Sequence, residues 1–224
     1  MSRAPWYAVA FTMLAILTPS PAHAQAPGAP RPSTARSRVT LRGFGEAGVT
    51  VFSATQSFKA ILGRPSGLVL GGGVELGLPK HLILSVAATR FRRTGHRAFV
   101  FEGEVFELDV PTTITVTPLE VTAGYRFANL GRLAPYAGGG IGWHKYDETS
   151  AHSTDADDVH KTFTGYHALG GAEVPLTNWI AAAVEAQWAV APNALGQDSS
   201  GVSSAYNERD LGGFTFRLKV VVGR

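Results

Sequence analysis

The sequence predicts an all-β fold: an eight-stranded antiparallel transmembrane up-and-down β-barrel with a polar interior. Three observations lead to this prediction. About eight segments alternate apolar with small, polar or charged residues, as a strand does when successive side chains point to opposite faces. The connections between these segments are alternately short and long, and an export-type segment opens the chain. Alternation behind an export signal is typical of proteins that cross a membrane with strands.

The alternating segments lie at residues 39–51, 67–78, 81–89, 119–127, 134–146, 162–174, 180–190 and 211–222. The last is the clearest, because its outward set is wholly apolar: Phe214, Phe216, Leu218, Val220 and Val222. The alanine-rich segment 180–190 also fits a helix, but the turn at 175–178 and the placement of its acid favour a strand.

In the first four segments the outward positions are mostly apolar: Leu41, Val49, Val51, Leu68, Leu70, Val74, Leu76, Leu82, Leu84, Val86, Leu119, Val121, Tyr125 and Phe127. The later segments continue the pattern with Ala137, Ile141, Trp143, Tyr166, Ala168, Val174, Ile180, Val184 and Trp188. Trp143, Tyr166 and Trp188 fall near one end of their strands and Tyr125 and Phe127 near the other, so two aromatic girdles are expected.

The connections alternate in length. Those at 79–80, 128–132 and 175–178 are short, whereas those at 53–66, 90–113, 147–161 and 191–209 are long. Short periplasmic turns and long outer loops are the pattern of outer-membrane barrels, so both chain ends are expected in the periplasm.

The amino-terminal residues predict export. Residues 1–24 hold Arg3, an apolar run at 6–17 that is too short to span a bilayer, and Ala22-His23-Ala24. We expect a signal peptide cleaved after Ala24; an amino-terminal anchor is the alternative. Residues 25–38, rich in Pro, Ala and Arg, predict a disordered periplasmic leader, and 39–224 the barrel. The formal charge of +3 implies no nucleic-acid partner, and the absence of cysteine leaves pairing and packing to hold the fold.

Nine charged residues fall on the predicted inward faces: Arg42, Glu46, Glu75, Glu120, Arg126, Glu173, Glu185, Arg217 and Lys219. A cation facing lipid near the midplane would cost about 2–4 kcal/mol, so this phase of the alternation is strongly selected. An eight-stranded interior is just wide enough for side chains to fill it, and the charges should pair across it. Closure makes the first and last strands neighbours, which predicts an ion pair between Arg217 and Glu46. This network fills the lumen; a narrow conduction path is the alternative, and a sugar substrate has no room.

The longest connection, 90–113, carries a hairpin signal in Phe99-Val100-Phe101, Glu102-Gly103-Glu104 and Val105-Phe106. The flanking strands are therefore expected to extend well above the membrane before Pro111 and Pro118 disturb the pairing. A projecting edge offers a surface partner a site for strand addition, although a stiff extension covered by neighbouring loops fits as well.

Four arginines lie at the base of this hairpin, where lipid phosphates are expected: Arg90, Arg92, Arg93 and Arg97. Because guanidinium groups bind phosphate bidentately, contact with lipopolysaccharide is one hypothesis, and solvated rim charges are the other.

The connection 147–161 is acidic, with Asp147, Glu148, Asp155, Asp157, Asp158, His152 and His160. Its spacing matches no calcium loop, so no metal site is predicted. The chain has no HExxH motif and no serine in a nucleophile elbow, so no catalytic residue, cofactor or enzyme activity is predicted.

With its signal peptide, eight alternating segments, PYAGGGIGW at 135–143 and GYHALGGAEVPL at 165–176, the chain resembles the small outer-membrane β-barrel proteins of the OmpA and OmpX type. The resemblance covers about 39–224 and implies a bacterial outer-membrane barrel without a further domain. Members usually end in an aromatic residue, whereas this chain ends Val222-Gly223-Arg224. Lipid A deacylases and palmitoyltransferases also have eight strands, but His152-Ser153-Thr154 falls in a loop rather than on a lipid-facing strand.

Together these observations predict a monomeric barrel with a structural role in envelope integrity or an adhesin-like role in surface interaction. A narrow channel for small solutes or ions is the alternative function. A soluble lipocalin-like barrel would place the aliphatic side chains inside and the charges outside, which contradicts the phase assigned above.

Overall fold

The structure is a computed structural model, and it describes residues 39–101, 104–150, 159–196 and 201–223. The expected signal peptide at 1–24 and leader at 25–38 lie outside the described residues, as does the centre of the hairpin turn at 102–103. All eight predicted strands fall within the described part of the chain.

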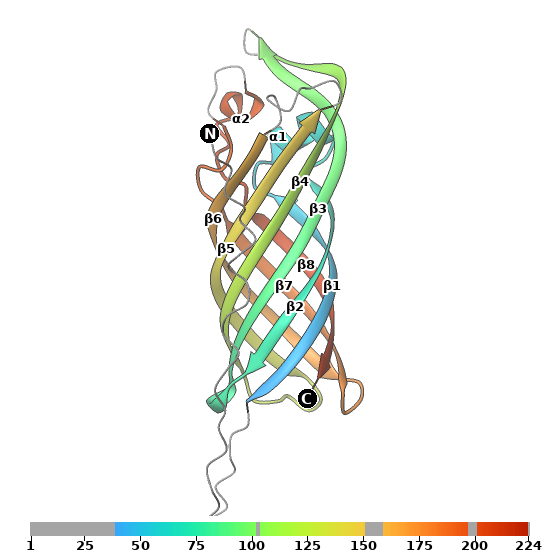
Figure 1. Cartoon of the computed structure of the whole chain (residues 1–224), viewed down its shortest axis with the longest axis vertical. Coiled ribbons are helices and arrows are strands. Elements are labelled where there is room, and N and C mark those ends of the chain that lie inside the picture. The colour runs from blue at the N-terminus through green and yellow to red at the C-terminus, as the bar shows by residue number, and fades with distance from the viewer. Residues whose placement is uncertain (1–38, 102–103, 151–158, 197–200, 224) are drawn as a thin grey trace, which may run out of the picture. The chain divides into compact units, whose positions relative to one another are not determined.

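Eight antiparallel strands form a closed barrel in sequence order, and β8 pairs with β1 to close it (Figure 1). The strands are β1 (Thr40–Phe52), β2 (Ser66–Gly77), β3 (Leu82–Phe101), β4 (Glu104–Arg126), β5 (Ala134–Ser150), β6 (Val159–Pro175), β7 (Ile180–Val190) and β8 (Gly213–Gly223). The predicted fold is confirmed, and the alanine-rich segment is strand β7 rather than a helix. Within the described ranges, no helix has the length and apolarity needed to cross a membrane.

The two faces of the barrel divide as the alternation predicts. On the outer face, Phe216 and Leu218 are 62% and 66% exposed. On the inner face, Glu46, Glu120 and Arg217 are only 7%, 4% and 6% exposed. The outward apolar side chains form one apolar band around the barrel: Leu41, Val49, Val51, Leu68, Leu70, Val74, Leu82, Leu84, Val86, Leu119, Ile141, Val184, Phe214, Phe216, Leu218, Val220 and Val222.

The apolar band has a recognisable upper border, above which the outward side chains become polar or charged. On β3 this change comes at Arg90 and on β5 at Lys145, both of which are exposed. Trp143, Tyr166 and Trp188 lie on the outer face close below that border, and Tyr125, Phe127 and Trp179 lie at the opposite end. We call the end above the border the outer end, and the end where β1 begins and β8 finishes the inner end.

The outer connections contain more regular structure than the sequence predicts. Helix α1 (Thr55–Leu62) lies in the first connection and the short helix α2 (Val202–Ala205) in the last. The expected third loop, 147–161, is strand at both of its ends, because β5 continues to Ser150 and β6 begins at Val159. Residues 151–158 between them lie outside the described part. At the inner end, a 3₁₀ turn, η1 (Pro79–His81), joins β2 to β3.

Strands β3 and β4 rise beyond their neighbours at the outer end, as the hairpin signal predicts (Figure 1). The prolines disturb their pairing as expected: the register shifts where His96 faces Pro111, and pairing is interrupted opposite Pro118. The two strands therefore remain paired through the extension despite these interruptions.

Helix α1 docks against β3 through two glycines. Gly63 ends the helix in the left-handed conformation, with a φ of 73° that favours glycine. On β3, a Cβ atom at Gly95 would lie 1.9 Å from the carbonyl oxygen of Ile61. The helix can therefore approach the sheet closely only because position 95 has no side chain.

Candidate functional site

The innermost closure of the barrel is a ring of two arginines and two glutamates, which we call the lower ring. Arg42 on β1 contacts Glu75 on β2, and its Nη1 lies 2.7 Å from Oε1 of Glu173 on β6. Arg126 on β4 lies 3.0 Å from each of the same two carboxylates. The four charges alternate and cancel, and a cavity of about 440 Å³ opens from the ring toward the inner end.

A second set of charges, the middle layer, lies above the lower ring. Arg217 Nη1 is 3.0 Å from Glu46 Oε1, and its other nitrogens are 3.7 Å from Glu120 and 3.5 Å from Glu185. Lys219 Nζ is 2.6 Å from Glu185 and 3.5 Å from Glu46. Three carboxylates thus share two cations in a part of the barrel that is almost fully buried. Arg217 is the only one of the two cations that reaches all three acids.

Neutral side chains complete the middle layer. Gln187 donates from Nε2 to Glu120 at 2.6 Å and accepts a hydrogen bond from Arg217. Tyr136 donates to Glu185 at 3.0 Å. These hydrogen bonds pair one oxygen each of Glu120 and Glu185 and one nitrogen of Arg217, whereas Glu46 Oε2, Glu185 Oε1 and Arg217 Nε are buried without a hydrogen bond from the described residues.

A cavity of about 50 Å³ separates the middle layer from the apolar side chains above it. That volume is enough for a few water molecules, since one needs roughly 10–15 Å³. Nearby, Thr122 and His167 form a buried hydrogen bond of 2.8 Å. The cavity is bounded below by Glu120, Gln187 and Arg217 and above by Phe52, Phe91, Val116 and Leu211.

All nine charged residues predicted to face the lumen do so, and the structure joins them into these two layers through ion pairs. The Arg217–Glu46 pair expected from barrel closure is among them. The contributions of Gln187 and Tyr136 were not predicted. Both occupy inward positions of the alternation, and that position is the sequence signal by which they could have been found.

The outer part of the interior corrects the expectation of a wholly polar lumen. It is filled by a set of apolar side chains that we call the plug. Phe52 and Phe58 stack with ring centroids 4.1 Å apart, and Phe91 meets Phe52 edge-on at 4.9 Å. Strands and outer connections both contribute to the plug, whose members are Phe52, Ala54, Phe58, Leu62, Val69, Phe91, Ile114, Val116, Tyr146, Ala191, Ala194 and Leu211.

A carboxylate from the last connection holds α1 on the plug. Glu208 accepts hydrogen bonds from the backbone N–H groups of Gln56 and Ser57, at 2.9 and 2.8 Å. It also accepts one from the Ser57 hydroxyl at 2.7 Å. The first turn of a helix has unpaired N–H groups and a partial positive charge, so a carboxylate here stabilises it. The sequence reasoning missed this contact, because Glu208 is 151 residues from Ser57 along the chain.

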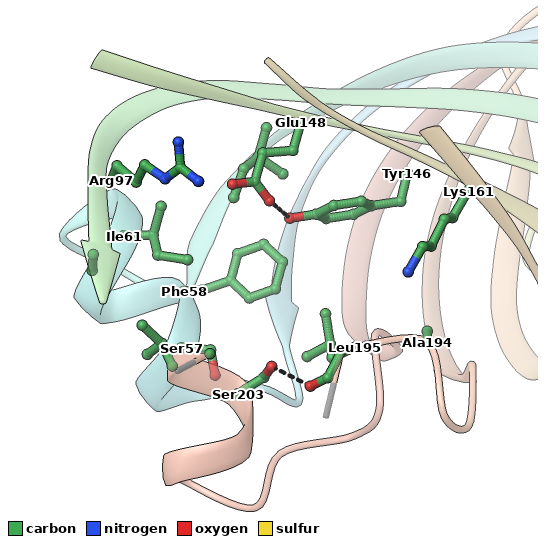
Figure 2. Close-up of a pocket in the computed structure, with 15 residues that line it drawn as sticks. Ser57, Phe58, Ile61, Arg97, Tyr146, Glu148, Lys161, Ala194, Leu195 and Ser203 are labelled. Atoms are coloured by element: carbon green, nitrogen blue, oxygen red, sulfur yellow. Dashed lines mark hydrogen bonds between the residues drawn. The ribbon is translucent and has the colours of Figure 1, made fainter. Parts of the chain in front are cut away.

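Between the plug and solvent lies a cavity of about 340 Å³, the outer pocket (Figure 2). Phe58, Ile61 and Leu195 line it with apolar surface, and Arg97 and Lys161 reach it from β3 and β6. Its other lining residues include Ser57, Ile114, Tyr146, Glu148, Ala194, Val202 and Ser203.

One acid and one phenol share the wall of the outer pocket. Tyr146 donates to Glu148 at 2.8 Å (Figure 2). Burial, and then the neighbouring Glu148 carboxylate, raise the pKa of Tyr146 well above its ordinary value. Tyr146 is therefore a neutral donor and Glu148 an occupied acceptor.

The four arginines assigned to lipopolysaccharide do not lie on one face. Arg90 and Arg92 are exposed at outward positions of β3. Arg93 instead donates from Nη1 to the carbonyl of Ser66 at 3.3 Å, and Arg97 lines the outer pocket. Strand alternation separates them, so only Arg90 and Arg92 remain together where lipid phosphates are expected.

The acidic third connection is only partly described, because His152, Asp155, Asp157 and Asp158 lie outside the described residues. Asp147 lies 2.6 Å from His160 Nδ1 and 3.2 Å from Lys145 Nζ. Burial alone would raise the pKa of Asp147, but its bonds with His160 and Lys145 lower it below the ordinary value. Across the described ranges, no group of three or more His, Asp or Glu side chains is arranged to hold a metal ion.

Several solved structures are similar to this chain in fold. They include the amino-terminal β-barrel domain of Pseudomonas aeruginosa OprF, at 15% identity and a TM-score of 0.44, covering 83% of this chain and 96% of that one. Neisserial surface protein A is similar at 12% identity and a TM-score of 0.48, with 83% and 97% covered. OprG from Pseudomonas aeruginosa is similar at 13% identity and a TM-score of 0.48, with 83% and 92% covered.

Sequence comparison gives a more specific result. No curated protein matches the chain. The outer membrane protein beta-barrel domain family, however, matches it over residues 10–208, which is most of its length. That range includes strands β1 to β7 of the closed barrel. The chain therefore belongs to the outer membrane protein beta-barrel domain family.

Proposed function

We propose that this outer-membrane barrel does not conduct solutes and that it acts through its outer face, in surface interaction or in maintaining the envelope. The observation that supports this most is that the interior is closed three times in series. The lower ring, the middle layer and the plug each contain side chains from several strands. A hydrated ion would have to break buried ion pairs and then cross an apolar layer, and both steps are costly.

The surface-interaction role is supported by the outer extension of β3 and β4. It stands above the apolar band and has exposed Phe106 and Leu108 side chains on β4. Its strand edges can pair with an extended segment of a partner. Export by a cleaved signal peptide at residues 1–24 is part of the same proposal, since this extension must reach the cell surface.

Planar-bilayer recording of the full-length refolded protein tests the closed interior. We expect no step conductance from the wild type, nor from a Phe52→Ala/Phe58→Ala variant, because the two charged layers remain closed in it. Electrophoretic heat-modifiability serves as the control for folding in each sample. Regular conductance steps from the folded wild type would reject the proposal in favour of the narrow channel.

A shortened hairpin tests the surface role. His96 and Pro111 face each other across the β3–β4 pair, so residues 97–110 can be replaced by an Asn-Gly turn. We expect bacteria displaying this variant to lose cell–cell or cell–surface attachment while the barrel still folds. A matched control changes Gly131, in the opposite connection, to Asn. If bacteria displaying the shortened variant attach as well as those displaying the wild type, the surface-interaction role is rejected and the role in maintaining the envelope remains.

We also propose that Arg90 and Arg92 contact lipopolysaccharide phosphates. The support is their exposure on one outward face, directly above the apolar band. An Arg90→Gln/Arg92→Gln variant should copurify with less lipopolysaccharide than an Arg132→Gln control, which changes an exposed arginine at the inner end. Equal amounts of bound lipid would mean that these arginines are solvated rim charges.

A further inference from the structure

We propose that the outer pocket binds a small amphiphile of about ten non-hydrogen atoms in all, with one carboxylate on an apolar body, such as a medium-chain fatty carboxylate. This inference is independent of whether the lumen conducts, because the pocket lies on the solvent side of the plug (Figure 2). It assigns a ligand chemistry to the outer mouth of the barrel.

The size of the pocket sets the size of the ligand. Its volume of about 340 Å³ lies at the lower end of the range for small-molecule pockets, roughly 300–1,000 Å³. At about 30 Å³ for each water molecule in the liquid, the pocket corresponds to roughly eleven waters. An eight-carbon carboxylate has about that many non-hydrogen atoms, whereas a diacyl lipid is several times larger.

The walls of the pocket favour an apolar body. Phe58 is buried in the plug with its ring facing the cavity, and Ile61 and Leu195 pack beside it (Figure 2). The hydroxyls of the wall are already engaged: Ser57 donates to Glu208, and Ser203 donates to the carbonyl of Gly196, each at 2.7 Å. A ligand body therefore meets carbon surface rather than groups that compete for hydrogen bonds.

The charges of the pocket favour an anionic head. Arg97 and Lys161 point into the cavity, with Glu148 between them in the view (Figure 2). Neither cation has an ion pair with another residue of the described part of the chain. Glu148 already accepts the Tyr146 hydrogen bond. Among the described lining residues, two cations and one acid leave a single positive charge, which matches a monoanion better than a dianion.

The guanidinium of Arg97 is the reason to expect a carboxylate as the anionic head of the ligand. Arginine presents a planar pair of N–H donors that fits both oxygens of a carboxylate, and the lysine ammonium group adds positive charge to the same pocket. Arg97 on β3 and Lys161 on β6 both line the cavity, so a head group paired with either cation lies beside the apolar walls.

Calorimetric titration of sodium octanoate into the full-length protein in lipid nanodiscs tests the inference. Empty nanodiscs serve as the reference, because octanoate also partitions into lipid. We expect saturable binding of octanoate to the wild type and none of octylammonium, which has the same body and the opposite charge. Absence of saturable octanoate binding, or equal binding of the two probes, would overturn the proposal.

Two variants locate the site. Arg97→Gln/Lys161→Gln should weaken octanoate binding by about tenfold or more, since two charge-assisted contacts are lost. Ile61→Trp should reduce it by filling the cavity. Arg132→Gln, which removes an exposed arginine at the inner end, should leave binding unchanged. Heat-modifiability checks that each variant is folded. If both pocket variants bind octanoate with the affinity of the wild type, octanoate binds elsewhere and the outer pocket is rejected as its site.

Discussion

The inner and outer halves of the barrel interior are closed by opposite chemistry. The inner half is filled by ion pairs, and the outer half by the aromatic and aliphatic side chains of the plug. On β3 the change coincides with the border of the apolar band. On β3 the outward residues pass from Val86 to Arg90 and Arg92, while the inward residues pass from Ser85 to Phe91.

This inversion shows how one alternating pattern serves two solvents. Within the membrane the outside is apolar, so only a polar inner face distinguishes the correct register. A slip of one residue would turn Glu120 or Arg217 toward lipid. Above the membrane the outside is water, and the ordinary rule of burying apolar side chains applies again. The plug is therefore a small soluble-type core on top of a membrane-type interior.

Removal of Arg217 should break the inner half most strongly. We expect Arg217→Gln to lower the free energy of unfolding by about 3–5 kcal/mol, because three buried carboxylates lose the cation they share. Urea unfolding in lipid vesicles, followed by tryptophan fluorescence, measures the loss. Arg132→Gln, at an exposed position, is the matched control and should change little.

Glu46→Gln sharpens the same test, since it removes one acid from a layer with three acids and two cations. Arg217 keeps Glu120 and Glu185, and Lys219 keeps Glu185 at 2.6 Å. We therefore expect a loss under about 2 kcal/mol, well below that of Arg217→Gln. Equal losses for the two variants would show that the pair, rather than the shared cation, holds the layer together.

Truncation of Phe52 to alanine should weaken the outer half, by less than the loss of Arg217 weakens the inner half. Phe52 packs against both Phe58 and Phe91, and Phe→Ala changes in cores cost about 3–5 kcal/mol. We expect about 3 kcal/mol in the same unfolding experiment, since the space lies between two cavities into which neighbours can move. A loss confined to faster amide exchange in α1, with global stability unchanged, would show that the plug folds separately from the barrel.

Glu208→Gln tests how the outer half is held from above. The variant keeps the size of the side chain but loses the charge that accepts three hydrogen bonds at the start of α1. We expect a loss of about 1–2 kcal/mol, seen as roughly tenfold or faster amide exchange at Gln56 and Ser57. Glu107→Gln, on the exposed extension, is the control. Unchanged exchange would mean that packing alone positions the helix.

The sequence was sufficient to predict the inner half because its determinants are periodic. Each strand alternates locally, and the positions of Glu46, Glu120 and Arg217 follow from that phase alone. The contact between Arg217 and Glu46 required only the additional assumption of closure. Even the disturbed pairing of the extension could be predicted, because proline acts on its own backbone.

The outer half could not be predicted in the same way, because its contacts join segments far apart in the chain. Phe52 and Phe91 lie just beyond the predicted strand ends, and Phe58 lies in a connection with no periodic signal. Helix α1 has no side-chain cap of its own, and its carboxylate comes from Glu208. The outer pocket results from these contacts, so it too required the structure.

We expect the smallest effect on stability from the exposed pair of Asp147 and His160. This pair lies near water, unlike the buried ion pairs of the lumen. The pKa of Asp147 is lowered in the folded protein, so the pair stabilises the fold at pH values above the ordinary aspartate pKa of about 3.9. That contribution is lost as the pH falls through the lowered pKa. Because the pair is near water, we expect less than about 1 kcal/mol, seen as a lower protection factor, relative to the intrinsic exchange rate at each pH, for the Lys161 amide below about pH 4. Asp147→Asn should abolish this acid dependence, whereas the same dependence in the variant would assign it to another group.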